Sequence, residues 1–224
     1  MGKKGTLVLF RHGETDHNAK HLMTGWLDVP LNAEGIEQAK EAGRAIATFY
    51  FDKVYCSTLS RTFNTAALAL EAAGTQAHLR LKDKWNFEAR DELKGANMGA
   101  FTGRDFKTDP ELLNFGRRYD RRLPGGESDK DIVTRVQKFF DAEILPRLER
   151  GETVLISTHS GTMRAFDVVL GFVPPPDPAD DQWTDKTRID NALPVVAEYE
   201  GGKLVRHYGL ERQKTAAVRS LKVA

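Results

Sequence analysis

The sequence predicts an α/β fold, a three-layer α/β/α sandwich over a mostly parallel sheet. Short apolar runs alternate with helical patterns along the chain, which is typical of parallel strands joined by crossover helices. The two clearest runs, residues 7–10 and 153–157, are apolar almost throughout, as expected of strands buried on both faces. With 224 residues, the chain is long enough for one domain, residues 1–224, with one sizeable core.

The composition narrows the classes of function. Lys and Arg number 33 against 32 Asp and Glu, so the overall charge indicates neither nucleic acid nor an anionic membrane as a partner. The apolar residues before Arg11 are too few for a signal peptide or a membrane span. Cys56 is the single cysteine, which excludes an internal disulfide framework and fits a reducing compartment. We therefore expect a cytoplasmic protein.

Cap and stop signals place the first elements. Asn32 is a good N-cap for a helical pattern with Glu34 and Glu37 in its first turn. Ser57 is expected to cap a second helix, which Gly74 ends. The expected elements are a strand at 7–10, a loop at 16–30, a helix after Asn32, a strand at 53–56, a helix at 59–73 and a strand at 78–81.

The middle of the chain, residues 83–122, is expected to be an irregular insertion because glycines interrupt it repeatedly. An insertion of this length in a compact domain is usually functional or disordered. The patterns after it predict a long helix at 128–150, a strand at 153–157, a helix at 162–170 and an antiparallel hairpin of residues 193–199 and 204–208.

Polar residues suited to a phosphoryl group follow three of the predicted strands. Arg11 and His12 end the first strand, Arg61 lies one turn into the helix after the second, and His159 follows the strand at 153–157. Because the carboxyl ends of parallel strands share one edge of the sheet, we expect these four side chains to converge.

The residue types indicate covalent chemistry at phosphorus. The planar guanidinium of arginine binds two phosphate oxygens at once and keeps its charge. Two nearby arginines should lower the pKa of His12 and leave it neutral and nucleophilic. His159 would then hold an oxygen of the group and stabilise charge in the transition state.

Several motifs resemble those of a known family. They are Arg11-His12-Gly13-Glu14-Thr15, Asn18, the run TGWLDVPL at 24–31, the run YCSTLSR at 55–61 with Thr65, the pair Glu127-Ser128, and the strand that leads into His159. In this order and spacing they resemble the histidine phosphatase superfamily, and most closely its cofactor-dependent phosphoglycerate mutase branch. The resemblance covers nearly the whole chain and implies a phosphoglycerate mutase-like fold.

The resemblance also implies roles for residues. It implies that His12 is phosphorylated, that Arg11, Arg61 and His159 hold the phosphoryl group, and that Asn18, Thr24 and Gly25 contact the substrate. Ser160 replaces the glycine that follows the histidine in mutases, and we place it among the substrate contacts.

One departure concerns the proton donor. The family's glutamate, four residues before the glycine that corresponds to Gly99, is here Gly95. A positioned general acid contributes about 10² to 10⁴ in rate. A short shift in register could bring another carboxylate into this position, with Glu92 and Asp91 the candidates ahead of Glu88.

The expected function is interconversion of 3- and 2-phosphoglycerate without a metal, primed by 2,3-bisphosphoglycerate. Arg117 and Arg118 resemble the double-arginine element with which mutases hold the substrate, and Arg104 or Lys107 could add a further cation. The insertion at 83–122 and the tail after Tyr208 could cover the site and exclude water. Mutase-like relatives also make a homodimer conceivable, although no residue identifies an interface.

Three other functions stay open on the sequence. The first is a small-molecule phosphomonoester phosphatase of the same superfamily. The second is a phosphate-binding relative that has lost turnover, which Gly95 would explain. The third is a metal-dependent hydrolase, for which His17 and His21 at helical spacing are the weak signal.

Overall fold

The fold is taken from a computed structural model, which describes residues 2–74, 76–116, 119–177 and 189–211. Within these residues, six strands form the main sheet in the order β5-β2-β6-β1-β7-β8. They are β1 (Lys4–Arg11), β2 (Lys53–Ser57), β5 (Glu88–Arg90), β6 (Thr153–Thr158), β7 (Val195–Glu200) and β8 (Lys203–Gly209). The pairs β5·β2, β2·β6 and β6·β1 are parallel, whereas β7 and β8 form the expected antiparallel hairpin.

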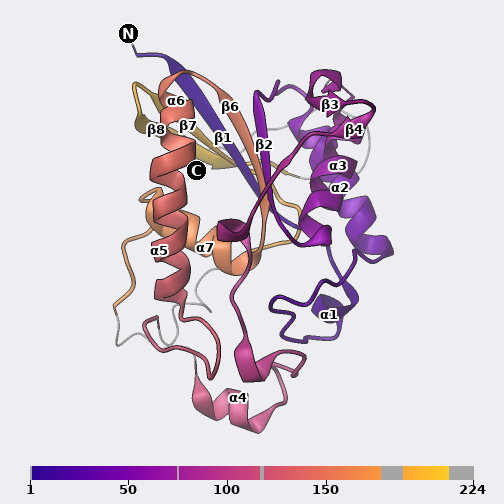
Figure 1. The fold of residues 1–224 in the computed structure, drawn as a ribbon, viewed down its shortest axis with the longest axis vertical. Coiled ribbons are helices and arrows are strands. Elements are labelled where there is room, and N and C mark those ends of the chain that lie inside the picture. The colour runs from indigo at the N-terminus through magenta and orange to yellow at the C-terminus, as the bar shows by residue number, and fades with distance from the viewer. Residues whose placement is uncertain (1, 75, 117–118, 178–188, 212–224) are drawn as a thin grey trace.

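Helices cover both faces of this sheet, as the three-layer fold class requires (Figure 1). The helices in the described residues are α1 (Asp16–Ala19), α2 (Ala33–Ile46), α3 (Ser60–Ala73), α4 (Pro110–Phe115), α5 (Asp129–Phe139), α6 (Leu145–Glu149) and α7 (Ser160–Val169). Short 3₁₀ turns lie at Ala77–Leu79, Asp91–Leu93 and Gly99–Phe101. In the part of the chain that the structure describes, no helix combines the length and the apolar character needed to cross a bilayer.

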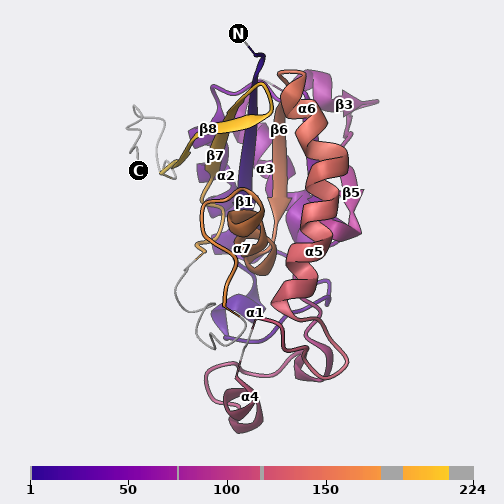
Figure 2. The same ribbon diagram turned by 90° about the vertical axis from the view of Figure 1, so that its left-hand side faces the viewer.

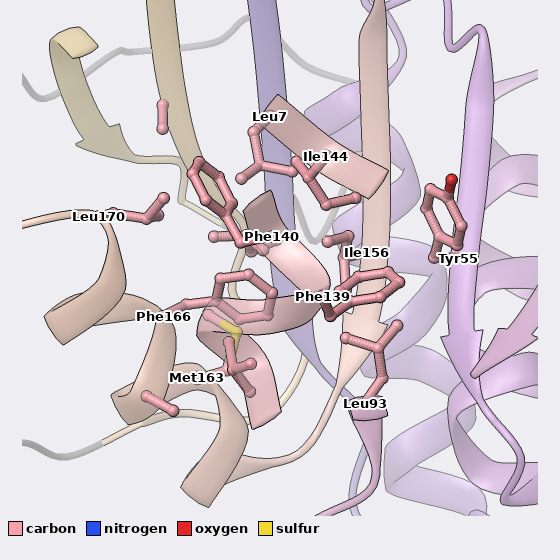
Figure 3. Packing of buried hydrophobic residues seen from close by; sticks show 14 of the residues in the cluster. Leu7, Tyr55, Leu93, Phe139, Phe140, Ile144, Ile156, Met163, Phe166 and Leu170 are labelled. Carbon is pink, nitrogen blue, oxygen red and sulfur yellow. The ribbon is translucent and has the colours of Figure 1, made fainter. Parts of the chain in front are cut away.

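Alternate residues of β1 face opposite layers, because side chains along a strand alternate between its two faces. Leu7 and Leu9 pack in a cluster with α5 and α7, whereas Val8 and Phe10 pack in a second cluster with α2 and α3. All four are buried, which explains why this strand is apolar without alternation. Figure 3 shows Phe139, Phe140 and Phe166 of the first cluster gathered with Ile156 between the helices and the sheet.

The segments that contain α1 and α4 lie beyond the carboxyl ends of β1, β2 and β6 (Figures 1 and 2). Both belong to stretches predicted as loop. In α1, Thr15 and Asn18 form a reciprocal capping box, and in α4 the Asp109 side chain accepts a hydrogen bond from the Leu112 N–H. The insertion is therefore less irregular than predicted, since it also contains β5, which joins the main sheet, and β4 (Lys84–Trp85), which pairs with β3 (Arg80–Leu81) just before the insertion.

Three further expectations need correction. Residues 80–81 form a strand, but it pairs with β4 and not with the main sheet. Ser57 does not cap α3, whose N-cap is Leu59 without a side-chain bond. The long helix is interrupted by a π-helical segment, Phe140–Ile144, between α5 and α6. Asn32 and Gly74, by contrast, cap and end their helices as predicted, and Gly74 has a φ of 76°.

Helices α2 and α3 approach closely at Gly43, and a substitution there tests whether this contact requires a glycine. A Cβ atom on Gly43 would overlap the carbonyl oxygen of Ala69. Helix propensity alone favours Gly43→Ala by about 1 kcal/mol, but overpacking costs about 1–3 kcal/mol. We therefore expect a net loss in the free energy of unfolding, measured by urea denaturation. The matched control is Gly161→Ala in α7, whose Cβ would make an ordinary 3.6 Å contact with Ile132, and a gain in stability at Gly43 would contradict the packing argument.

Candidate active site

The pairing of β1 with β6 brings the two strand-end histidines together. Arg11 is in register with Thr158, and the His12 N–H donates to the Thr158 carbonyl at 2.8 Å. His12 and His159 follow directly, and their ring centroids lie 5.0 Å apart in an edge-on arrangement. Both residues are only 4% exposed. The predicted convergence of the two strand ends is therefore confirmed.

The ring of His12 has a defined tautomer. Its Nδ1 lies 2.7 Å from the carbonyl oxygen of Gly13. Because a carbonyl can only accept, Nδ1 carries the proton and Nε2 keeps its lone pair. Burial, together with the charges of Arg11 and Arg61, holds the pKa of His12 well below its usual value of 6.5. His12 is therefore neutral at pH 7, with Nε2 available as a nucleophile.

His159 is fixed by a hydroxyl. Its Nε2 lies 2.8 Å from Oγ of Ser57, which is also bonded to the Thr62 hydroxyl and accepts from the Leu59 N–H. Burial, and then the neighbouring His12 and arginines, hold the pKa of His159 well below 6.5. Ser57, predicted to be a helix cap, thus orients the second imidazole instead.

Arg11 is buried at the end of β1. Its Nη1 donates to the Ile189 carbonyl at 2.9 Å. Burial, followed by the charge of Arg164, lowers the pKa of Arg11 to about 10, whereas Asp190 stabilises the cation. Within the described residues its buried Nε has no partner. A guanidinium in this state has an unused donor that an anion could accept from.

Arg61 holds the loop after α1. It is 1% exposed, and it donates to the carbonyls of Leu27 at 2.7 Å and Gly25 at 3.0 Å. Burial lowers its pKa to about 10, against a smaller stabilising effect of Asp28. Its Nε is likewise buried without a partner among the described residues. Two desolvated cations with unused donors make this end of the sheet suited to an anion.

These side chains line one cavity of about 650 Å³, a size typical of small-molecule sites. The structure brings eight of the predicted site residues to its wall, namely Arg11, His12, Asn18, Thr24, Gly25, Arg61, His159 and Ser160. The charged residues of the described wall are three arginines, Arg11, Arg61 and Arg164, and one carboxylate, Asp190.

Gly95 lies directly against the second histidine. A Cβ on Gly95 would be 3.2 Å from Cβ of His159, and its buried carbonyl accepts from Trp26 Nε1 at 2.9 Å and from Arg135 Nη2 at 3.0 Å. Arg135 also bonds the carbonyl of Lys94 and the carboxylate of Glu127. The segment at the position of the family's proton donor is thus held in place although it lacks the carboxyl group.

The carboxylates proposed to replace this donor do not reach the cavity. Asp91 bonds Thr58 at 2.7 Å and Lys94 at 2.8 Å, with its side chain 73% exposed. In the 3₁₀ turn Asp91–Leu93, the buried position belongs to Leu93. Asp91, Glu92 and Glu88 are all outside the described cavity wall, and Glu88 pairs with Lys53 and Arg90. This corrects the expectation of a short register shift.

Two of the four expected substrate cations are engaged elsewhere. Arg104 forms a two-point ion pair with Asp109 at 2.6 and 2.8 Å and also pairs with Glu111 at 2.9 Å. Lys107 Nζ lies 2.9 Å from Nε2 of His21. Neither residue is part of the described cavity wall.

The other two expected cations, Arg117 and Arg118, lie outside the described residues, as does the tail at 212–224. In the described part of the chain, no group of three or more His, Cys, Asp or Glu side chains is placed to hold a metal ion, and this includes His17 and His21.

Three polar residues of the described cavity wall were missed by sequence reasoning. Arg164 follows Ser160 by one helical turn on α7, so the i, i+4 spacing could have placed both on the same wall. Asp190 and Asn191 had no sequence signal, and Asn191 reaches the site through long-range pairing. Asn191 forms a bridge with Arg11 and donates to the His12 carbonyl at 2.8 Å.

An α/β sandwich that places two histidines and two buried arginines at one sheet edge corresponds to the histidine phosphatase class. A family profile of the histidine phosphatase superfamily (branch 1) matches residues 7–203, and the chain belongs to this superfamily.

Curated relatives carry a more specific name. A 2,3-bisphosphoglycerate-dependent phosphoglycerate mutase of Parvibaculum lavamentivorans is 35% identical over 213 residues, which cover 92% of this chain and 97% of the relative. One of the same name from Methylorubrum populi is 40% identical over 168 residues, which cover 73% and 78%.

Solved structures with the same fold include both mutases and phosphatases. A putative alpha-ribazole-5'-P phosphatase from Escherichia coli has a TM-score of 0.72 at 22% identity, covering 98% of this chain and all of that chain. A phosphoglycerate mutase from Bacillus anthracis has a TM-score of 0.69 at 24% identity, covering 96% and 95%. A mycobacterial glucosyl-3-phosphoglycerate phosphatase has a TM-score of 0.66 at 25% identity, covering 86% and 92%.

The two buried histidines predict a loss of stability in acid. Each imidazole returns to a pKa near 6.5 on unfolding, whereas the folded pKa of both is lower. Below about pH 6.5 the unfolded chain therefore binds more protons, and the free energy of unfolding falls by up to about 1.4 kcal/mol per pH unit for each histidine. Urea denaturation at about pH 7.5, 6.5 and 5.5 measures this slope.

The control for this slope is His12→Asn, which removes one of the two titrating groups. In this variant we expect the free energy of unfolding to fall less steeply with decreasing pH than in the wild type. The difference in slope should be up to about 1.4 kcal/mol per pH unit. Identical pH dependence in the two proteins would contradict the lowered pKa of His12.

Proposed function

We propose that the chain transfers the phosphoryl group of a small phosphate monoester to Nε2 of His12. The observation that carries this proposal is the His12 ring, whose Nδ1 is bonded to the Gly13 carbonyl while Nε2 keeps its lone pair in a cavity that also contains Arg11 and Arg61. In the first step the Nε2 lone pair forms the N–P bond while the ester P–O bond breaks. The leaving oxygen departs with the bonding electron pair and takes a proton from solvent water.

The residues of the cavity supply charge stabilisation for this step. The guanidinium groups of Arg11 and Arg61 neutralise the phosphoryl oxygens, and they retain unused Nε donors in the described structure. The ring centroids of His12 and His159 lie 5.0 Å apart, so a phosphoryl group on His12 would lie close enough to contact the ring of His159. Water then attacks phosphorus, and the N–P bond breaks with its electron pair returning to Nε2. The proton of the attacking water leaves with inorganic phosphate or passes to solvent, and His12 is neutral again.

Hydrolysis is placed ahead of isomerisation because two of the four cations expected to hold a second acidic group are engaged by other residues. A mutase must bind a second acidic group and retain a bisphosphorylated intermediate. Arg104 already has two carboxylate partners, and Lys107 lies beside His21. Without a carboxyl at Gly95, esters with good leaving groups should react fastest, because they need the least proton transfer.

Phosphoglycerate mutase activity is the second candidate. It is favoured by relatives of that name that are 35–40% identical to this chain. In this reading, 2,3-bisphosphoglycerate would phosphorylate His12, and 3- and 2-phosphoglycerate would interconvert through a bisphosphorylated intermediate. Arg164, on the cavity wall, could then hold the second acidic group. A homodimer and a cytoplasmic location stay predictions in either case.

A paired assay tests the proposed function. One arm measures inorganic phosphate from 4-nitrophenyl phosphate, and the other supplies 3-phosphoglycerate with 2,3-bisphosphoglycerate and follows 2-phosphoglycerate. We expect phosphate release, an acid-labile phosphohistidine after quenching, and loss of both in His12→Asn. Isomerisation without phosphate release would favour the mutase, and phosphate binding without any turnover would indicate a relative that binds and does not react.

A carboxyl group introduced at position 95 should widen the range of esters. Gly95→Glu is expected to raise kcat/KM for alkyl phosphates by up to about 10² to 10⁴, because the poor leaving group can then be protonated. The gain is reduced by the shift that His159 must make to admit a Cβ at 3.2 Å. Gly95→Gln is the matched control, since it has the same size without an acidic proton. Equal alkyl phosphate turnover in the two variants would contradict the missing-acid explanation.

A further inference from the structure

One side of the cavity is apolar. It is formed by two neighbouring residues after α1 and by four residues of the insertion at 83–122, and we call it the apolar wall: Leu22, Met23, Met98, Phe106, Leu112 and Leu113. The charged residues of the described cavity come from other places, namely β1, α3, α7 and Asp190. The cavity therefore has two chemically different sides.

The apolar wall is built on a fixed base. Met23 and Arg104 are joined through the Met23 N–H and the Arg104 carbonyl at 2.8 Å, and the Gly103 N–H returns to the Met23 carbonyl at 2.8 Å. Leu22 forms a bridge with Asp105. Behind these contacts, Met23 and Leu112 pack in a small buried cluster that also contains Phe101 and Leu123. The wall is therefore supported by its own core.

The nearest charges are turned to other partners. Arg104 is paired with Asp109, the N-cap of α4, and with Glu111 of the same helix. These ion pairs tie the segment of Phe106 to the helix of Leu113. Lys107 lies beside His21, and the His21 ring packs edge-on against Phe106 at 5.6 Å between centroids. Arg104 and Lys107, two of the four cations expected to hold substrate, thus help to position apolar side chains.

Two side chains of the apolar wall are largely open to solvent. Phe106 is 42% exposed and Leu113 is 56% exposed. Large apolar side chains that share a cavity with polar, buried catalytic groups are typical of ligand sites, in which apolar surface binds the body of the ligand and a few polar groups orient it. A ligand that covers this surface would bind more tightly as the apolar area removed from water increases.

We infer that the substrate is a phosphate monoester whose alcohol part carries an aryl or branched alkyl group. The phosphoryl group binds at Arg11, Arg61 and the two histidines, and the apolar group of the alcohol lies against Phe106, Leu113 and Met98. The inference rests on the proposed function, and it adds the substrate class. A small polyanion such as a bisphosphorylated glycerate would leave this apolar surface uncovered.

The test is a series of 4-alkylphenyl phosphates, from the unsubstituted phenyl ester through methyl, ethyl and propyl. The leaving phenols all resemble the tyrosine side chain, with a pKa of about 10, so leaving-group chemistry stays constant while apolar area grows. We expect kcat/KM to rise by about fourfold for each methylene that contacts the wall, which is about 0.8 kcal/mol. 3-Phosphoglycerate should compete weakly with the propyl ester.

Variants separate the apolar wall from a general effect of hydrophobicity. Leu113→Ser should flatten the rise along the series. Leu81→Ser is the matched control, because Leu81 is 63% exposed on β3 and outside the described cavity wall, and its slope should equal that of the wild type.

The possible failures are distinguishable. Turnover of phenyl phosphate with no rise along the series, or an equal rise in Leu113→Ser, would overturn the inference and leave the proposed function standing. Strong competition by 3-phosphoglycerate against the propyl ester would also overturn it. Absence of both turnover and phosphohistidine with every ester would overturn the proposed function and, with it, this inference.

Discussion

The in-register parallel pairing of β1 with β6 is the constraint on which the site depends. Because Arg11 pairs with Thr158, the next residue of each strand is a histidine, and the two rings meet at 5.0 Å. A shift of one residue would send each side chain to the other face of the sheet. The register is held by the alternate packing of Leu7 and Val8 into different layers, so the same apolar residues that form the core also align the chemistry.

Burial determines the charge states of the two histidines and lowers the pKa values of the two arginines at this site. His12 and His159, each 4% exposed, are neutral at pH 7. Arg11 and Arg61 remain charged at this pH, although burial lowers the pKa of each to about 10. Backbone carbonyls of Gly25, Leu27 and Ile189 satisfy part of each guanidinium. Neutral carbonyls replace lost hydrogen bonds to water, but they do not cancel the charge. An anion does both, and the carboxylates of Asp190 and Asp28 already stabilise these two cations in part.

The features that were predicted correctly from the sequence are those that depend on local residue patterns. The buried strands, the Asn32 cap, the Gly74 stop and the convergence of the strand-end residues follow from residue type and strand direction. The failures share a tertiary cause. Ser57 looks like a cap but bonds His159, 102 residues away, and Asn191 reaches His12 across 179 positions. The sign of Arg104's charge is readable from the sequence, whereas its pairing with Asp109 and Glu111 depends on how the chain folds around α4.

Gly95 affects one of the two parts of the proposed reaction. Attack on phosphorus does not require a carboxyl group at position 95, whereas protonation of the leaving oxygen would use one. The groups that the proposed reaction needs for the N–P bond are present: a ring nitrogen of His12 with its lone pair, two arginines and an oriented His159. Position 95, where the family has its proton donor, carries no carboxyl group, although Trp26 and Arg135 still hold the carbonyl of Gly95 against the site. Charge on the leaving oxygen is then relieved less in the transition state, so the rate depends more steeply on the acidity of the alcohol. In such a site, binding energy from the apolar part of the substrate takes on greater weight, because it lowers the barrier without requiring a proton at the leaving oxygen.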